Sequence, residues 1–205
     1  MTNKQITFST KDNPLTIFVD GSDQGKHTTE PKLGFGVYLN YEGKEYEISG
    51  TKDEINQLLS DFNGVALSNP TMEMLGLMVA LKAFEFSSEH LLIRQDYIGA
   101  INYGALWNHS KGSEHRKANP WKTRKPYIKY IVAEIEKSLK MICSNGGSVR
   151  ILWVPGHITP AKLRKYKCVF QKLSDEEIKF LKEGNDSADK AAKCQESKNT
   201  LKELL

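Results

Sequence analysis

The first third of the chain is a series of short apolar runs separated by polar turn residues. The run from Leu15 to Ser22 (LTIFVDGS) places Leu, Ile, Phe and Val before an acid, a glycine and a serine, which predicts a buried strand that ends near Asp20. Two further strand-like runs, 34–41 and 44–49, are separated only by Glu42 and Gly43. Such close spacing predicts a hairpin, so the three strands are expected to form an antiparallel meander.

Helical periodicity follows the meander. Thr51 and Glu54 have the spacing of a capping box, and apolar residues recur at helical spacing over the next two turns. A second helix is predicted from Asn69 as its N-cap, with Pro70 in the first turn, to about Phe86. Its Met, Leu and Val residues indicate that this helix is mostly buried.

The rest of the chain alternates between strand-like and helical segments. Apolar runs at 90–93 and 149–154 predict two more strands, and the first ends close to Asp96. Helices are predicted over 97–107, from Pro126 to the glycines at 146 and 147, from Ser174 to about Gly184, and from Asn185 to about Lys193. The segment 158–172 is basic and is expected to be irregular.

This order of elements predicts a mixed α/β fold, in which parallel pairing is added to an antiparallel meander. The main domain is expected to span residues 15–193. An N-terminal extension over 1–14 precedes it, and a polar C-terminal tail over 194–205 follows it.

Composition restricts the class of protein. The 205 residues are 39% hydrophobic and 26% charged, which fits one globular domain and fits disorder, coiled coil or collagen poorly. The net charge of +4 would suit a polyanionic partner but is too small to identify one. Three cysteines without metal-ligand spacing argue against a disulfide framework or a zinc site. With no signal peptide and no apolar run of bilayer length, a cytoplasmic or nuclear location is expected.

Acidic residues recur where strands end or helices begin, and they are the first candidates for chemistry: Asp20, Glu73, Asp96 and either Asp186 or Asp189. Taken singly, each has an ordinary explanation, because Asp-Gly is often a turn and a glutamate near a helix start interacts with the helix dipole. His157, which follows the strand at 149–154, is likewise more often structural than catalytic. A basic segment over 108–125 carries Trp121 and fits either a solvated loop or a surface that binds a sugar-phosphate backbone.

Five short motifs occur in an order that resembles the type 1 ribonuclease H family. They are VDGS (19–22), NPTMEM (69–74), RQDYIGAI (94–101), WVPGH (153–157) and GNDSADKAAK (184–193). Each motif is short, but five in this order are hard to obtain by chance. The resemblance implies a ribonuclease H-like fold, with a mixed five-stranded sheet and helices on both faces. The last two motifs are also similar to ribonuclease H domains of reverse transcriptases, although no polymerase segment accompanies them here, which favours a stand-alone enzyme.

The resemblance also implies the site residues. Four metal-binding carboxylates fall on Asp20, Glu73, Asp96 and Asp189, the last chosen over Asp186 by its Asn-x-x-x-Asp spacing. His157 matches the mobile-loop histidine of the family, which assists proton transfer or product release. Substrate contacts are implied for residues at RNA-binding or DNA-binding positions: Gly21, Ser22 and Asn69 for the RNA strand, and Trp121, Lys122 and Thr123 for the DNA strand.

The implied activity is that of a metal-dependent endonuclease that hydrolyses the RNA strand of RNA–DNA hybrids. Four carboxylates in one cleft would repel one another, so their ionisation depends on bound cations. Oxygen ligands favour hard ions, and two Mg²⁺, with Mn²⁺ as a substitute, are expected about 3.5 to 4 Å apart. The implied partner is an RNA–DNA hybrid, with no membrane and no obligatory protein partner.

The chain also departs from the family pattern. Tyr97 and Ile98 stand where many relatives have polar residues. The segments over about 51–67 and 158–183 are longer than in compact relatives and are expected to be insertions, of which the second could supply an extra nucleic-acid surface. Two other functions stay open: a nuclease or resolvase that acts on DNA junctions, and a non-catalytic nucleic-acid-binding module.

Overall fold

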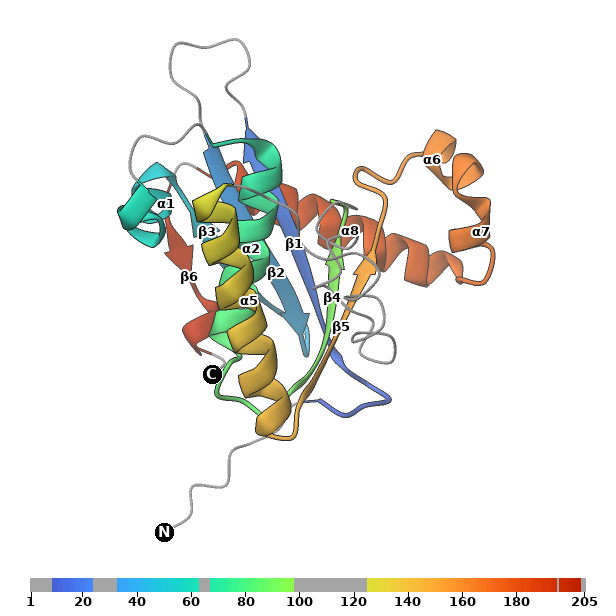
Figure 1. The fold of residues 1–205 in the computed structure, drawn as a ribbon. Coiled ribbons are helices and arrows are strands. Elements are labelled where there is room, and N and C mark those ends of the chain that lie inside the picture. Colours follow the sequence, from blue (N-terminus) through green and yellow to red (C-terminus); the bar gives the residue numbers. More distant parts are fainter. Residues whose placement is uncertain (1–8, 24–32, 63–66, 98–124, 195, 204–205) are drawn as a thin grey trace.

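The sheet joins an antiparallel meander to two parallel strands (Figure 1). The computed structural model describes residues 9–23, 33–62, 67–97, 125–194 and 196–203. Its strands are β1 (Leu15–Asp23), β2 (Leu33–Tyr41), β3 (Lys44–Gly50), β4 (His90–Gln95), β5 (Ser148–Trp153) and β6 (Lys198–Asn199). β1, β2 and β3 pair antiparallel in succession, whereas β4 lies parallel to β1 and β5 lies parallel to β4, which gives the order β5-β4-β1-β2-β3-β6. The predicted mixed α/β fold is confirmed.

The turn between β2 and β3 is the predicted hairpin. Tyr41 pairs with Lys44, so only Glu42 and Gly43 lie between the paired positions. Both have positive φ, 52° and 78°. Two successive residues in the left-handed region make a turn whose twist matches that of the flanking strands, and glycine adopts this conformation without steric cost.

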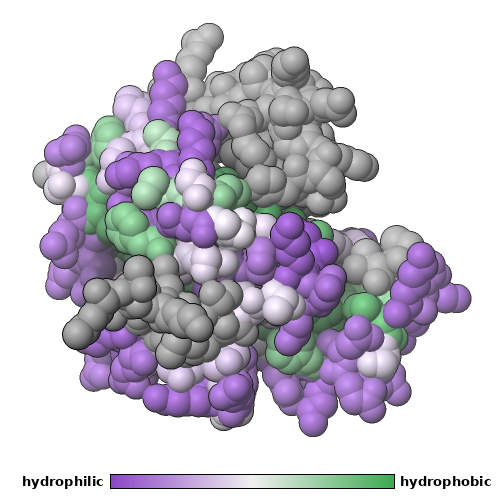
Figure 2. All heavy atoms as spheres, turned by 90° about the horizontal axis from the view of Figure 1, so that it is seen from below, coloured by the Kyte–Doolittle hydropathy of each residue, from purple (hydrophilic) through white to green (hydrophobic). Residues whose placement is uncertain are grey.

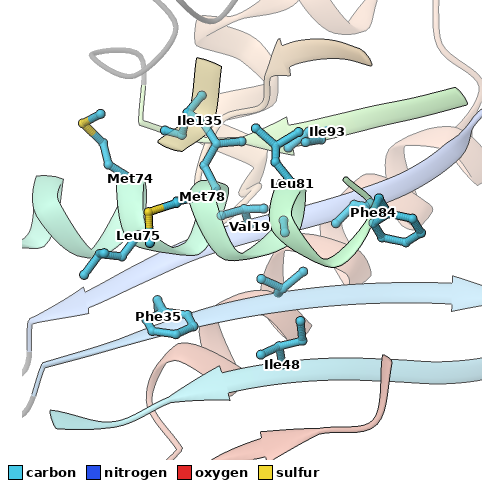
Figure 3. Close-up of a cluster of buried hydrophobic side chains, with 14 of the residues drawn as sticks. Val19, Phe35, Ile48, Met74, Leu75, Met78, Leu81, Phe84, Ile93 and Ile135 are labelled. Atoms are coloured by element: carbon cyan, nitrogen blue, oxygen red, sulfur yellow. The ribbon is translucent and has the colours of Figure 1, made fainter. Parts of the chain in front are cut away.

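Helices cover both faces of the sheet (Figure 1). On one face lie α2 (Asn69–Ala83) and α5 (Pro126–Ser144), and on the other lies α8 (Asp175–Ala192). Nearly every side chain of α2 from Thr71 to Leu81 is buried, because this helix lies between the sheet and α5. Figure 3 shows this main core, in which Met78 and Leu81 of α2 gather with Val19 of β1 and Ile135 of α5.

The first two helices differ from the prediction only at their ends. α1 (Lys52–Leu58) begins with the predicted capping box, where the Thr51 amide donates to Glu54 Oε2 at 3.1 Å, and a short 3-10 turn, η1 (Ser60–Phe62), follows it. The N-cap of α2 is Ser68, so the predicted Asn69 is already the first helical residue. The helix ends at Ala83, three residues before the predicted end, because the chain then turns into β4.

The predicted break at Gly184 is wrong, since α8 is one continuous helix. A Cβ atom at this position would overlap the ring of Phe18 on β1. Gly184 therefore allows the helix to pack closely on the sheet instead of ending it. Gly36 on β2 acts in the same way, because a Cβ there would overlap the carbonyl oxygen of Ala188.

The segment predicted to be irregular contains two short helices, α6 (Pro160–Lys165) and α7 (Lys167–Phe170). Thr159 caps α6, as its Oγ1 accepts a hydrogen bond from the Lys162 amide at 3.3 Å. A second, smaller apolar cluster forms under these helices and includes Phe18, Val154, Phe170 and Leu181. Helices of one or two turns are too short to show an apolar periodicity in the sequence.

The last strand, β6, adds a sixth strand to the five that the sequence predicts. Lys198 and Asn199 pair antiparallel with Ser49 and Ile48 of β3. The amide of Glu47 also donates to Thr200 Oγ1 at 2.9 Å, just before a final 3-10 turn, η2 (Leu201–Glu203). This segment of two strand residues is too short for a hydrophobic pattern to identify it.

Most of the predicted helix over 97–107 and of the basic segment over 108–125 lies outside the described residues. Within the described part of the chain, every helix is too short or too polar to cross a lipid bilayer. The proposed domain boundaries stay predictions.

Candidate active site

Two neighbouring parallel strands bring Asp20 and Asp96 together. Val19 of β1 pairs with Gln95 of β4, so the residues that follow them lie side by side at the carboxyl edge of this part of the sheet. Asp20 is 6% exposed and Asp96 is half-buried. The strand pairing thus delivers two acids to one point, as the sequence predicts.

The third acid, Glu73, comes from α2 and is 2% exposed. Its helix approaches β1 so closely that a Cβ atom at Gly21 would overlap the Glu73 backbone nitrogen. One carboxylate oxygen each from Asp20, Glu73 and Asp96 lie within 4.8 Å of one another. We call these three residues the carboxylate cluster.

Burial and mutual repulsion set the protonation of the cluster. Burial, followed by the charge of Asp96, raises the pKa of Asp20 to about 7. Burial and the charges of Asp20 and Asp96 raise the pKa of Glu73 far above its usual range. Burial also raises the pKa of Asp96, although the positive charges of Lys162 and His157 oppose this effect. At neutral pH, the full ionisation of the cluster therefore needs additional positive charge.

Hydrogen bonds from four sides orient the cluster. The Gly21 amide donates to Asp20 Oδ1 at 2.7 Å, and Asn69 Nδ2 lies 3.4 Å from Glu73 Oε1. The indole Nε1 of Trp153 donates to the main-chain oxygen of Asp96 at 2.9 Å. Gln95 Nε2 donates to the main-chain oxygen of Glu73 at 2.9 Å and lies 3.5 Å from its Oε2.

The structure does not bring the predicted fourth carboxylate into the cluster. Asp189 lies near it, since its negative charge raises the pKa values of Asp20 and Asp96. Its Oδ2 is 2.6 Å from Lys193 Nζ, one turn further along α8. Asp186 lies beside His157, with 3.9 Å between Oδ1 and Nδ1, and the choice between Asp186 and Asp189 stays a prediction.

His157 lies at the rim of the site. Its side chain is 63% exposed and its backbone has a φ of 47°. Among residues other than glycine in the described part of the chain, only Glu42 shares this left-handed conformation. The ring is exposed to solvent, and its positive charge opposes the rise that burial causes in the pKa of Asp96.

The predicted substrate-binding residues have different surroundings. Gly21 and Ser22 are buried, and the Gly21 amide is directed at Asp20. Asn69 is directed at Glu73. Trp121, Lys122 and Thr123 lie outside the described residues.

Sequence reasoning missed three residues that support the cluster. Gln95 is fully buried and directly precedes Asp96 at the end of β4. Because side chains alternate between the two faces of a strand, the sequence could have placed Gln95 on the face of the sheet that α2 covers. Gly156 packs against Asp96, where a Cβ atom would overlap the carboxylate. Trp153 lies beside Asp96 because β5 pairs in register with β4. The last two belong to the WVPGH motif, but their contacts depend on the sheet register.

The cluster fits a divalent cation on chemical grounds. Three converging carboxylates offer the hard oxygen ligands that Mg²⁺ and Mn²⁺ prefer, and bound positive charge would relieve their repulsion. Asp20, Glu73 and Asp96 would hold such an ion.

Comparison with known proteins gives the family. The RNase H family model matches residues 12–197. The solution structure of the RNase H domain of prototype foamy virus is 16% identical over 87% of this chain and 91% of that chain, with a TM-score of 0.50. Two crystal structures of the prototype foamy virus protease-reverse transcriptase, native and CSH mutant, are each 18% identical, with TM-scores of 0.50 and 0.51 over 86% and 93% of this chain.

At this level of identity, the likeness concerns the fold alone. The chain spans only 20% and 22% of the length of the two protease-reverse transcriptase chains. A search of curated protein sequences finds no match. The match of the family model over nearly the whole sequence, together with the carboxylate cluster, shows that the chain belongs to the RNase H family.

Proposed function

We propose that this protein is a metal-dependent endonuclease that hydrolyses the RNA strand of RNA–DNA hybrids. The observation that carries the proposal is the carboxylate cluster, in which three buried or half-buried acids from β1, α2 and the end of β4 converge within 4.8 Å in a member of the RNase H family. Such a site is suited to oxygen-bound metal ions. When bound, divalent ions activate a water molecule and stabilise the leaving oxygen.

The protein side chains have separate tasks in this proposal. Asp20, Glu73 and Asp96 bind the metal ions, and Asp189 completes the site from α8. His157, exposed at the rim, moves a proton or assists the release of product. The surrounding hydrogen bonds hold the carboxylates in position before substrate arrives, which reduces the reorganisation needed during the reaction.

Recognition of the hybrid would need contacts with both strands. The 2′-hydroxyl groups distinguish RNA from DNA, and Gly21, Ser22 and Asn69 are the proposed contacts to that strand. Trp121, Lys122 and Thr123 are the proposed contacts to the DNA strand. Replacing Trp121 and Lys122 should weaken hybrid binding and reduce the dependence of affinity on salt concentration. If the salt dependence did not change, other residues would bind the DNA strand.

The decisive test compares substrates and metals. A matched RNA–DNA hybrid, duplex DNA, duplex RNA and a four-way DNA junction are incubated with Mg²⁺, with Mn²⁺ and with chelator. We expect cleavage of the RNA strand of the hybrid, only with a divalent metal. Preferential cleavage of the junction would support a resolvase, and binding without metal-dependent turnover would support a non-catalytic module.

The variant Asp96→Asn tests the site itself. Because the substitution removes a metal-binding charge and keeps the side-chain size, it should abolish cleavage in Mg²⁺ and leave hybrid affinity largely intact. Asp61→Asn, at an exposed acid in η1, serves as the matched control. Continued cleavage by Asp96→Asn at the rate of the control would contradict the proposal.

A further inference from the structure

A second positively charged surface lies beside the candidate active site. It is formed by residues 158–173, which include α6 and α7, and we call it the basic arm. All of its charged side chains are basic: Lys162, Arg164, Lys165, Lys167 and Lys172. Figure 1 shows α6 and α7 projecting beyond the β5 edge of the sheet, on the side where α8 begins. This surface is separate in sequence from the basic segment that contains Trp121.

The arm is anchored by apolar contacts. Ile158 and Phe170 are each 5% exposed and belong to the small cluster with Val154 and Leu181. The ring of Tyr166 meets the ring of Trp153 edge to face, with 4.9 Å between the centroids. These contacts fix one side of the arm against β5 and α8.

The opposite side of the arm presents its charges to solvent. Arg164, Lys165, Lys167 and Lys172 are exposed, while Lys162 is half-buried. Figure 2, seen from below, shows mostly hydrophilic residues on the outer surface of this side of the molecule, around a small hydrophobic area. The arm thus has the division expected of a binding surface, with apolar residues for anchoring and cations for a partner.

The exposed cations of the arm are not neutralised by acidic side chains. Throughout the described ranges, Arg164, Lys165, Lys167 and Lys172 form no ion pair with an aspartate or glutamate. Lysines elsewhere do pair, as Lys82 does with Glu134 at 2.8 Å. Exposed cations that gather without forming ion pairs are typical of surfaces that bind nucleic-acid phosphates.

Two contacts connect the arm to the carboxylate cluster. Trp153, on which Tyr166 packs, donates its indole hydrogen bond to the main-chain oxygen of Asp96. Lys162 Nζ donates to the main-chain oxygen of Gly156, the residue that packs against the Asp96 carboxylate. Burial raises the pKa of Asp96, and the positive charge of Lys162 opposes this rise. The arm therefore begins at the active-site edge, and its exposed cations extend away from it.

We propose that the basic arm binds the phosphate backbone of the same duplex whose scissile strand enters the carboxylate cluster. This inference rests on the proposed function, in which that duplex is an RNA–DNA hybrid. α6 is about 9 Å long and begins next to the segment that contacts Asp96, so its cations are placed to contact the backbone of a duplex held at the cluster. Contacts to phosphates orient the duplex without reading its sequence.

The test compares two triple variants in binding and cleavage. The arm variant carries Arg164→Ala, Lys165→Ala and Lys167→Ala, and leaves Lys162 intact because it contacts Gly156. The control variant carries Lys137→Ala, Lys140→Ala and Lys202→Ala, at three exposed lysines on α5 and η2. Hybrid affinity is measured against salt concentration in the Asp96→Asn background, which separates binding from turnover. Cleavage by the same triple variants is measured without that substitution.

The arm variant should bind the hybrid more weakly, because it has fewer cations to bind phosphates. The slope of log affinity against log salt should fall by about one for each phosphate that the variant no longer binds. The ratio of the affinity of the unaltered protein to that of the arm variant should be larger at about 50 mM salt than at about 200 mM salt. For each phosphate that the variant no longer binds, this ratio should decrease about 3.5-fold across that range. In cleavage, the effect should appear in KM more than in kcat.

Equal affinity and equal salt slope for the arm and control variants would overturn this inference, and would assign the arm to another partner such as an acidic protein. That result leaves the proposed function standing if the unaltered protein cleaves the hybrid. If the unaltered protein neither binds nor cleaves the hybrid, the proposed function fails and the inference fails with it. Circular dichroism of both triple variants verifies that each is folded.

Discussion

The side-chain nitrogen of Gln95 lies 2.9 Å from the main-chain oxygen of Glu73, and this bond joins the end of β4 to the first turns of α2. Both residues are buried, so without this donor the main-chain oxygen of Glu73 has no access to bulk water as a replacement partner. We predict that Gln95→Met lowers the free energy of unfolding by about 1 to 3 kcal/mol. It should also raise the Mg²⁺ concentration needed for half-maximal cleavage, because Glu73 is less well positioned.

Ser138→Ala is the matched control for Gln95→Met. Ser138 is fully buried on α5 and donates to Glu85 Oε2 at 3.0 Å, beyond the end of α2 that is opposite to Glu73. Urea denaturation should show comparable decreases in stability for the two variants. An equal change in Mg²⁺ dependence for both would argue against a positioning role for Gln95.

Gly156→Ala should separate activity from stability. A Cβ atom at this position would overlap Asp96 Oδ2, which is the movable end of a side chain. The protein should therefore fold with a modest decrease in stability while the carboxylate is displaced. We predict at least about a 100-fold fall in kcat/KM, since a displacement of about 1 Å can cost this much. A variant as active as the unaltered protein would show that Asp96 does not need its observed position.

Gly21→Ala should reduce both the stability of the protein and its cleavage activity. Here the added Cβ atom would overlap the Glu73 backbone nitrogen and lie 2.7 Å from the Met72 carbonyl carbon, so β1 and α2 must move apart. We predict a decrease of about 2 to 3 kcal/mol in the free energy of unfolding, together with loss of cleavage. Gly43→Asn is the control, because its surroundings are open and asparagine tolerates the positive φ. Thermal unfolding of both variants gives the comparison.

Asp189→Asn should be less damaging than Asp96→Asn. Asp189 lies outside the carboxylate cluster and is paired with Lys193, so the three clustered acids remain to bind metal. We expect reduced kcat and a requirement for more Mg²⁺, with cleavage still measurable. Complete loss of cleavage by a folded Asp189→Asn protein would show that the fourth carboxylate joins the cluster when metal and substrate bind.

The stability of the metal-free protein should depend on pH in a defined direction. Because the pKa of Asp20 is raised to about 7, the folded protein holds a proton that the unfolded chain releases near pH 4. The folded state binds more protons in this range, so the free energy of unfolding should fall as the pH rises from about 4 to about 7, by up to about 4 kcal/mol. Urea unfolding in chelator measures this dependence.

Asp20→Asn removes one of the groups responsible and should reduce this part of the pH dependence, while Glu73 and Asp96, whose pKa values burial also raises, keep their contributions. Adding Mg²⁺ to the unaltered protein should reduce the destabilisation at the upper end of the range, because bound metal takes the place of the proton. Parallel curves for the unaltered protein and Asp20→Asn would show that other groups control the dependence.

The sequence predicts the elements whose structure depends on residues that are close to one another along the chain. The turn at Glu42 and Gly43 and the capping box of Thr51 and Glu54 are of this kind, and the structure has both. The same holds in part for the two aspartates: Asp96 follows β4 directly, whereas β1 continues three residues beyond Asp20, to Asp23. Their meeting point follows once the two strands are parallel neighbours.

The failures lie where tertiary contacts decide the local structure. The sequence pattern predicts a helix end at Gly184, but the close approach of Phe18 explains the glycine, and Phe18 is distant in sequence. The link between Gln95 and Glu73 likewise depends on how α2 packs against β4. A strand as short as β6 has no periodicity of its own and forms only because β3 offers an edge with which it can pair.

The continuity of α8 has a mechanical consequence. This helix of 18 residues, about 27 Å long, has Leu181 packed near the base of the basic arm, and its Asp189 acts electrostatically on the carboxylate cluster. Because both residues lie on one continuous helix, the position of Asp189 depends on how Leu181 packs in the small apolar cluster. Leu181→Ala should weaken the packing of α8 on this cluster, and faster hydrogen exchange of the α8 amides near Asp189 in the variant would show that the two regions of the helix depend on each other.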